Sequence, residues 1–128
     1  MRYLIDTHLT LWIPSGDARV SSKLLRLLEE DENEFLFSTV SLWEIAIKRS
    51  LGKADFQIDP RGVRRQLQRA GYEELPVLGE HAVAVDGIPF IHKDPFDRIL
   101  IAQAMVEGIT LLTADATIAR YSGPIRKV

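Results

Sequence analysis

The sequence of 128 residues contains no cysteine, which excludes disulfide bonds and thiolate-bound zinc. It also has no apolar run close to the roughly 20 residues that a membrane-spanning helix needs. Residues 1–6 lack the long apolar stretch of a secretory signal. These absences predict a cytoplasmic protein without a membrane partner, and they leave oxygen and imidazole nitrogen as the ligands for any metal.

Neither positive nor negative charge is in large excess. The chain has 16 lysines and arginines against 18 aspartates and glutamates, for a net charge of −2. Taken alone, this balance argues against nucleic acid as a partner. The phosphate-binding pattern Gly-x-x-x-x-Gly-Lys and the nucleophile pattern Gly-x-Ser-x-Gly are also absent, which argues against the enzyme classes that use them.

Short apolar runs alternate with helical patterns along the chain, which is typical of an α/β protein. Strands are expected at residues 3–5, 35–37, 109–112 and 125–128, with an extended piece at 75–78. Helices are expected at residues 9–13, 22–28, 41–51, 60–70, 80–85, 95–107 and 114–120. We expect a single domain over residues 1–128, with a short, mainly parallel sheet covered by helices on both faces.

Carboxylates recur where the expected strands end and the next helices begin. Asp6 ends the first strand, and Asp115 follows the strand at 109–112. Glu44 lies near the start of the helix after the second strand, and Asp94 and Asp97 lie at the start of the helix at 95–107. Because ligands bind beyond the carboxyl ends of strands in an open parallel sheet, these side chains are expected to share one edge.

Each of these carboxylates also has a local explanation that needs no shared site. Asp6 and Asp94 suit the capping position of a helix, where aspartate is preferred. Asp97 and Asp115 suit a first helical turn, where negative charge interacts favourably with the helix dipole. Glu44 suits an ion pair with the lysine four residues later. The sequence leaves both explanations open.

Several carboxylates in one cleft repel each other unless a cation lies among them. Mg²⁺ and Mn²⁺ prefer such oxygen ligands. The three histidines, His8, His81 and His92, are scattered and give a zinc site little support, and His92 is expected to be structural or to support a ligand. A divalent cation in an acidic pocket suits chemistry on phosphate, because it activates water and neutralises the charge of the transition state.

Four motifs follow one another along the chain: Asp6-Thr7-His8, Ser41-Leu42-Trp43-Glu44-Ile45-Ala46-Ile47-Lys48, His92-Lys93-Asp94-Pro95-Phe96-Asp97-Arg98 and Thr113-Ala114-Asp115. Together they resemble the PIN-domain ribonucleases of the VapC toxin type over essentially the whole chain. The resemblance implies a PIN-like three-layer α/β/α fold and a metal-dependent endoribonuclease. It also implies the toxin of a type II toxin–antitoxin pair, which inhibits translation by hydrolysing RNA to 5′-phosphate and 3′-hydroxyl ends.

The resemblance assigns roles to individual residues. The set that it implies for Mg²⁺ or Mn²⁺ is acidic throughout: Asp6, Glu44, Asp97, Asp115 and, directly or through water, Asp94. Thr7 and Thr113 match small hydroxyl positions beside this set, where helix capping is an equal alternative. Arg98 has two interpretations, namely a contact to phosphate or an ion pair with a nearby carboxylate.

An enzyme that acts on RNA needs positive surface in spite of the balanced charge. One candidate group closely follows Glu44 in the sequence and consists of Lys48, Arg49 and Lys53. The other lies on one face of the helix expected from residue 60 and consists of Arg61 and Arg65, flanked by Arg64 and Arg69. A solvated face without a ligand is the alternative for this second group.

The resemblance further implies partners. Transfer RNA and ribosomal RNA are both compatible as substrates. A cognate VapB-type antitoxin would hold the enzyme inactive, often with a basic side chain near the acidic pocket, and homodimers are common in the family. Trp12 and Trp43 lie in helical apolar patterns and are expected to pack in the core or between subunits.

Three other functions fit the sequence less well. A receiver-like Mg²⁺-binding signalling domain would need paired acidic residues after the first strand, where Asp6 stands alone. A non-catalytic RNA-binding PIN domain would show the loss of an acidic position, and all four core positions are present. DNA-directed nucleases of the same superfamily usually carry extra elements, for which 128 residues leave little room.

Overall fold

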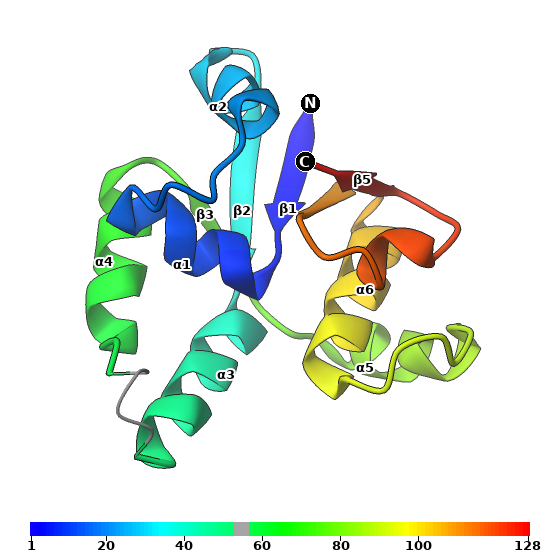
Figure 1. Ribbon diagram of the computed structural model, residues 1–128. Coiled ribbons are helices and arrows are strands. Elements are labelled where there is room, and N and C mark those ends of the chain that lie inside the picture. The colour runs from blue at the N-terminus through cyan, green and yellow to red at the C-terminus, as the bar shows by residue number, and fades with distance from the viewer. Residues whose placement is uncertain (53–56) are drawn as a thin grey trace.

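The computed structural model describes residues 1–52 and 57–128. Its five strands form one sheet in the order β3-β2-β1-β4-β5, and every neighbouring pair is parallel. The strands are β1 (Arg2–Ile5), β2 (Glu34–Ser38), β3 (Glu73–Leu75), β4 (Thr110–Thr113) and β5 (Ile125–Lys127). The α-helices are α1 (Thr7–Ser15), α2 (Ser22–Glu29), α3 (Thr39–Ser50), α4 (Pro60–Arg69), α5 (Gly79–Ala84) and α6 (Pro95–Glu107), with short 3-10 helices η1 (Val85–Gly87) and η2 (Ile118–Arg120) (Figure 1).

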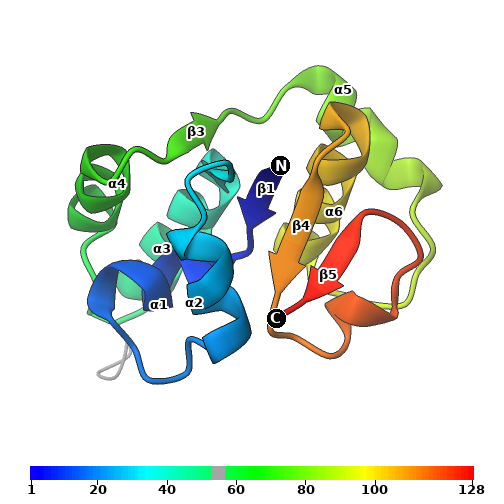
Figure 2. The same cartoon turned by 90° about the horizontal axis from the view of Figure 1, so that it is seen from above.

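The sheet separates two hydrophobic cores, because successive side chains of a strand point to opposite faces. Leu4 of β1 belongs to one core, which α5 and α6 cover. The next residue, Ile5, belongs to the other core, which α1, α2 and α4 cover. Figure 2 shows these two groups of helices on opposite sides of the strands. The predicted three-layer α/β/α fold with a parallel central sheet is therefore confirmed.

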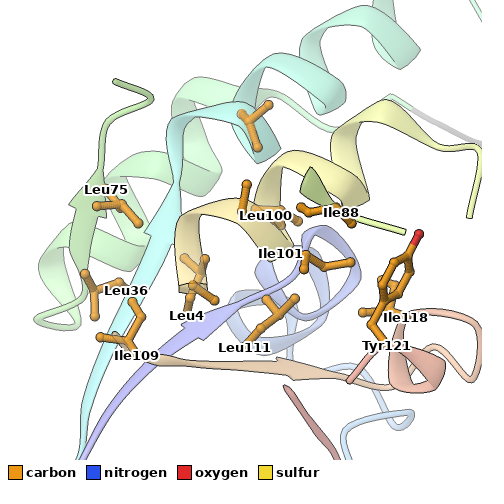
Figure 3. Packing of buried hydrophobic residues seen from close by; sticks show 13 residues of the cluster. Leu4, Leu36, Leu75, Ile88, Leu100, Ile101, Ile109, Leu111, Ile118 and Tyr121 are labelled. Atoms are coloured by element: carbon orange, nitrogen blue, oxygen red, sulfur yellow. The ribbon is translucent and has the colours of Figure 1, made fainter. Parts of the chain in front are cut away.

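The core on the α6 side is built from aliphatic side chains of the sheet and the helix. Leu4 and Leu111 from neighbouring strands pack with Leu100 and Ile101 of α6, and none of the four is more than 1% exposed (Figure 3). Burial of one such side chain contributes about 1.5–3 kcal/mol. Tyr121 closes the edge of this core with its ring.

Two expected elements differ from the structure. The extended piece expected at 75–78 pairs only as β3 up to Leu75, because Pro76 has no N–H to donate to the ladder. The helix expected at 114–120 is reduced to η2. An oxygen of Asp115 accepts hydrogen bonds from the N–H groups of Thr117 and Ile118, which closes a tight turn ahead of η2.

The start of α3 also differs from its expected position. The helix begins at Thr39, two residues before the expected start, because the side chain of Ser38 accepts a hydrogen bond from the Val40 N–H and caps it. Glu44 therefore lies in the second turn of α3 instead of the first. Among the described residues, no helix is both long enough and apolar enough to cross a membrane.

Candidate active site

The candidate site lies beyond the carboxyl ends of the strands. β1 leads directly into α1, β2 leads into α3, and α6 begins at the same end of the sheet (Figure 1). The hydroxyls of Thr7 and Ser41 are both buried and lie 3.0 Å apart, which joins the first turns of α1 and α3. This bond brings Asp6, just before α1, and Glu44, one turn after Ser41, towards the same region.

Asp6 is a buried carboxylate with a role in the fold. It is 1% exposed, and its Oδ1 accepts a 3.0 Å hydrogen bond from the Leu9 N–H at the start of α1. Its Oδ2 accepts a 2.6 Å hydrogen bond from the Thr113 hydroxyl. Burial raises the pKa of Asp6, although the bonds from Thr113 and Leu9 act in the opposite direction. The local explanation as a helix cap therefore holds, and it leaves each oxygen further acceptor capacity.

Thr113 connects Asp6 to Asp115. The Asp115 N–H donates a 3.0 Å hydrogen bond to the hydroxyl oxygen of Thr113, which itself donates to Asp6. The negative charge of Asp115 contributes to the raised pKa of Asp6. The two carboxylates thus come together at the ends of β1 and β4, which are neighbouring strands.

Glu44 carries an unusual buried oxygen. The residue is 4% exposed, and its Oε2 forms a 2.8 Å ion pair with Lys48 Nζ, as the local explanation predicts. Its Oε1 is buried, and it is the one buried side-chain oxygen or nitrogen in the described residues for which the structure shows no hydrogen-bond partner. Because an unpaired buried acceptor costs about 1–3 kcal/mol, this oxygen needs an explanation.

Asp94, Asp97 and His92 form the third part of the site. Asp94 caps α6 by accepting hydrogen bonds from the N–H groups of Phe96, at 2.8 Å, and Asp97, at 3.2 Å. Asp97 Oδ2 lies 2.7 Å from His92 Nε2. One ligand atom from each of His92, Asp94 and Asp97 lies within 4.8 Å of the other two, which is close enough to surround one cation.

The electrostatic state of Asp97 reflects this crowding. Burial raises the pKa of Asp97 to about 7, with further contributions from the negative charges of Asp94 and Glu44, while the hydrogen bond to His92 opposes the rise. Asp97 is therefore near enough to Glu44 to be affected by its charge. Such mutual repulsion is the arrangement that a cation relieves.

The donor set fits a hard divalent cation. It consists of carboxylates, as Mg²⁺ and Mn²⁺ prefer, and the unpaired Oε1 of Glu44 offers a buried acceptor that a cation would satisfy. Asp6 and Asp115 are linked through Thr113, and Asp94 and Asp97 lie together with His92, so the carboxylates form two pairs. A second cluster, of Glu80, His81 and Glu107, lies at the far end of α6 and was not predicted.

Arg98 is bound to backbone groups of the loop before α6. It is 9% exposed and donates hydrogen bonds to backbone carbonyls, at 3.0 Å to Pro89 and at 3.2 Å to Ile88. Its guanidinium also lies 5.0 Å from the centre of the Phe90 ring. Among the described residues the structure shows no ion pair between Arg98 and a carboxylate, because the guanidinium points into the loop before α6 and holds it in place, and the phosphate contact stays a prediction.

The basic residues proposed for RNA binding differ in their ion pairs and in their exposure. Lys48 pairs with Glu44, and Arg49 pairs with Asp59 at 3.2 Å, so both are tied to acidic partners at one end of α3 and α4. Arg61 and Arg65 are exposed on α4, where Arg61 also reaches Asp59. Lys53 lies outside the described residues.

Sequence reasoning passed over two residues that organise the site. Ser41 holds Thr7, and its position three residues before Glu44 on the same helix was the available signal. Tyr121 holds the backbone of residues 91 and 92 through its hydroxyl. No pattern in the sequence marked Tyr121, because the contact joins segments that are about 30 residues apart.

Comparisons with known proteins define the class to which this fold and site belong. The family model described as the PIN domain matches residues 3–124, and the chain therefore belongs to the PIN-domain family. A search of curated protein sequences gave no match.

Solved structures share the fold at low sequence identity. VapBC2 from Rickettsia felis, bound to a DNA fragment from its promoter, matches with a TM-score of 0.71 and 15% identity, covering 99% of this chain and 98% of that one. VapBC-1 from nontypeable Haemophilus influenzae matches with a TM-score of 0.63 and 14% identity, covering 99% and 98%. A toxin–antitoxin complex from Klebsiella pneumoniae matches with a TM-score of 0.65 and 14% identity, covering 97% and 95%.

Proposed function

We propose that this PIN-domain protein is a Mg²⁺- or Mn²⁺-dependent endoribonuclease, formed by residues 1–128 as one domain, and that it is the VapC-type toxin of a type II toxin–antitoxin pair. The observation that carries the proposal is the group of carboxylates around Glu44, whose Oε1 is buried without a hydrogen-bond partner among the described residues and whose charge acts on Asp97. Two of the five carboxylates, Asp6 and Glu44, are buried, and a hydrolase for phosphodiesters uses such a group of carboxylates to hold its cation.

The chain's own residues would perform the reaction as follows. Asp6, Glu44, Asp97 and Asp115, with Asp94, would hold the divalent cation, which supplies charge neutralisation for the phosphate and lowers the pKa of water. Asp6 is 1% exposed, and each of its oxygens already accepts a hydrogen bond. Its role is therefore to hold the cation, and it would not exchange protons with water. Asp97, whose side chain is 15% exposed, is better placed to orient the attacking water.

RNA would approach the pocket along α3. Lys48 lies about one turn after Glu44 on that helix, and Arg49 is the next residue. Their side chains are 41% and 39% exposed. Arg49 could exchange Asp59 for a phosphate group, since an exposed ion pair is worth only about 0–1 kcal/mol, and Lys48 could turn to phosphate when a cation takes its place beside the buried Glu44. Arg61 and Arg65 on α4 would extend this contact along the RNA backbone. The substrate is a structured RNA such as a transfer RNA or a ribosomal RNA loop, and its cleavage would inhibit translation in the cytoplasm.

Two protein partners belong to the proposal. The matched structures are toxin–antitoxin complexes, which supports a cognate VapB-type antitoxin for this chain. A homodimer is supported by an apolar face between α3 and α6, where Trp43 is 61% exposed and packs edge-on against Phe96 at 5.3 Å between ring centres. A hollow of about 290 Å³ beside this pair is lined by apolar side chains, including Val85 and Ile99.

The proposal is tested with purified protein and labelled structured RNAs. Wild type with Mg²⁺ or Mn²⁺ is expected to cleave, and chelation by EDTA is expected to abolish cleavage. Glu44→Gln and Asp97→Asn keep the size of each side chain but remove its charge, and each is expected to lose at least about 100-fold in rate. An Asp97→Asn variant that cleaves as fast as wild type would show that the metal site is assigned wrongly.

A further inference from the structure

His92 lies inside the candidate site, and the contacts that it makes there define its role more closely than the sequence could. Its side chain is 23% exposed, and its Nε2 lies 2.7 Å from Oδ2 of Asp97. A carboxylate that binds a cation is ionised and can only accept hydrogen bonds. In that state the imidazole must donate from Nε2 to Oδ2, which leaves Oδ1 of Asp97 for the cation.

The backbone around His92 is held in place by the side chain of Tyr121. The Tyr121 hydroxyl accepts hydrogen bonds from the N–H groups of His92, at 2.8 Å, and of Ile91, at 3.2 Å. Figure 3 shows the Tyr121 ring at the edge of the core, with its oxygen pointing away from the sheet on the side of Ile88. Tyr121 itself is 5% exposed, so the anchor is part of the packed interior.

Arg98 anchors the same loop a few residues earlier. Its guanidinium donates to the carbonyls of Pro89 and Ile88, and it also lies 3.4 Å from the Tyr121 oxygen. Burying a guanidinium against backbone carbonyls costs solvation free energy. This cost is explained if the site needs the loop, and therefore His92, in a fixed position.

We propose that His92 is a positioning residue for metal binding, which donates from Nε2 to Asp97 Oδ2 and fixes that carboxylate, and that Tyr121 and Arg98 hold its loop in place. The inference rests on the proposed function, since it concerns the same pocket. Partners that fix a ligand from behind typically change metal affinity by about 10- to 100-fold.

A purely electrostatic effect of a basic side chain would change the metal affinity in the opposite direction. Loss of a nearby basic side chain would raise the affinity for a divalent cation, because a source of repulsion disappears. Loss of a positioning hydrogen bond would lower the affinity, because Asp97 becomes free to rotate. Lys93 is the matched control, because it is the exposed basic neighbour of His92 in the same loop.

The experiment measures Mn²⁺ binding to the full chain by electron paramagnetic resonance. Relative to wild type, His92→Ala is expected to bind about 10- to 100-fold more weakly, and His92→Gln, which keeps a donor at the same reach, within about 3-fold. Tyr121→Phe removes the anchor but keeps the imidazole, and it is expected to show an intermediate loss. Lys93→Ala is expected to bind no more weakly than wild type.

Three outcomes would overturn the inference. In the first, His92→Ala binds Mn²⁺ as tightly as wild type. In the second, His92→Gln is as weak as His92→Ala while both unfold at the same temperature in EDTA, so that the donor does not matter. In the third, the spectrum of wild type shows a directly bound nitrogen, which would make His92 a ligand. A wild-type protein that binds no Mn²⁺ would instead refute the proposed function, so the two failures are distinguishable.

Discussion

Thr113 donates a 2.6 Å hydrogen bond to Oδ2 of Asp6, and so joins two residues that lie 107 positions apart in the sequence. The same hydroxyl oxygen accepts a bond from the N–H of Asp115. Because Asp6 follows β1 and Thr113 ends β4, and these strands pair in parallel, one hydroxyl organises the carboxylates of two strand ends. Thr113 therefore stabilises the fold and also positions two carboxylates of the candidate site.

The role of Thr113 is tested by Thr113→Val, which keeps the shape of the side chain but removes the hydroxyl. We expect a loss of about 1–3 kcal/mol in the free energy of unfolding, because both Asp6 Oδ2 and the Asp115 N–H lose a partner. Mn²⁺ affinity is expected to fall by about 10-fold or more. Urea unfolding and a Mn²⁺ titration measure the two effects. Thr113→Ser retains the hydroxyl, and equal losses in both variants would contradict this role.

Asp97 should make the stability of the metal-free protein depend on pH. Its pKa is raised from 3.8 to about 7 in the folded state. Between these values the folded state holds a proton that the unfolded chain has released, so the contribution of Asp97 to stability is full below pH 4 and is lost as the pH rises through 7. We expect a decrease on the order of 1–3 kcal/mol in the free energy of unfolding over this range in EDTA.

The control for this pH dependence is Asp97→Asn, which does not titrate. The stability of wild type relative to Asp97→Asn is expected to fall between pH 4 and pH 7, when both are unfolded by urea in EDTA. Saturating Mn²⁺ is expected to remove this fall, because the cation stabilises the ionised carboxylate. A difference between the two proteins that is flat or rises with pH would show that Asp97 is not the titrating group.

Arg98 is predicted to act on stability and loop position instead of on RNA affinity. Arg98→Ala removes the donors to the carbonyls of Pro89 and Ile88, and we expect a loss of about 2–4 kcal/mol in the free energy of unfolding. Arg98→Lys should recover little of it, because an ammonium cannot reproduce the planar fork. Lys93→Ala, at an exposed position nearby, should stay within about 0.5 kcal/mol of wild type. Arg98→Ala with wild-type stability and weaker RNA binding would restore the phosphate interpretation.

The fold was largely predictable from the sequence, because it depends on local and periodic signals. Apolar runs such as Leu4-Ile5 and capping residues such as Ser21 mark strands and helix starts by their own chemistry. The general rule for parallel sheets then places Asp6 and Asp115 at one edge. The local explanations, in which Asp6 and Asp94 cap helices, are correct as well, so capping and convergence coexist.

The contacts that refine the site were not predictable in this way. The sequence suggested a phosphate contact or an ion pair for Arg98, whereas its backbone partners depend on the path of the chain at residues 85–92, which no periodicity defines. Tyr121 reaches His92 across a sequence separation that leaves no pattern. For Trp43, the helical apolar pattern defines a face but not what covers it, and within this chain that face remains exposed.

The most direct test of the central claim is the chemistry of the RNA ends that the purified protein produces. Water attack in an acidic metal pocket predicts fragments with 5′-phosphate and 3′-hydroxyl ends, made only with Mg²⁺ or Mn²⁺ and not by Asp97→Asn purified in parallel. These ends are read by ligation and by mass spectrometry of the fragments. Fragments that carry 2′,3′-cyclic phosphates, or that appear equally in EDTA or with Asp97→Asn, would contradict the claim that these carboxylates cleave RNA.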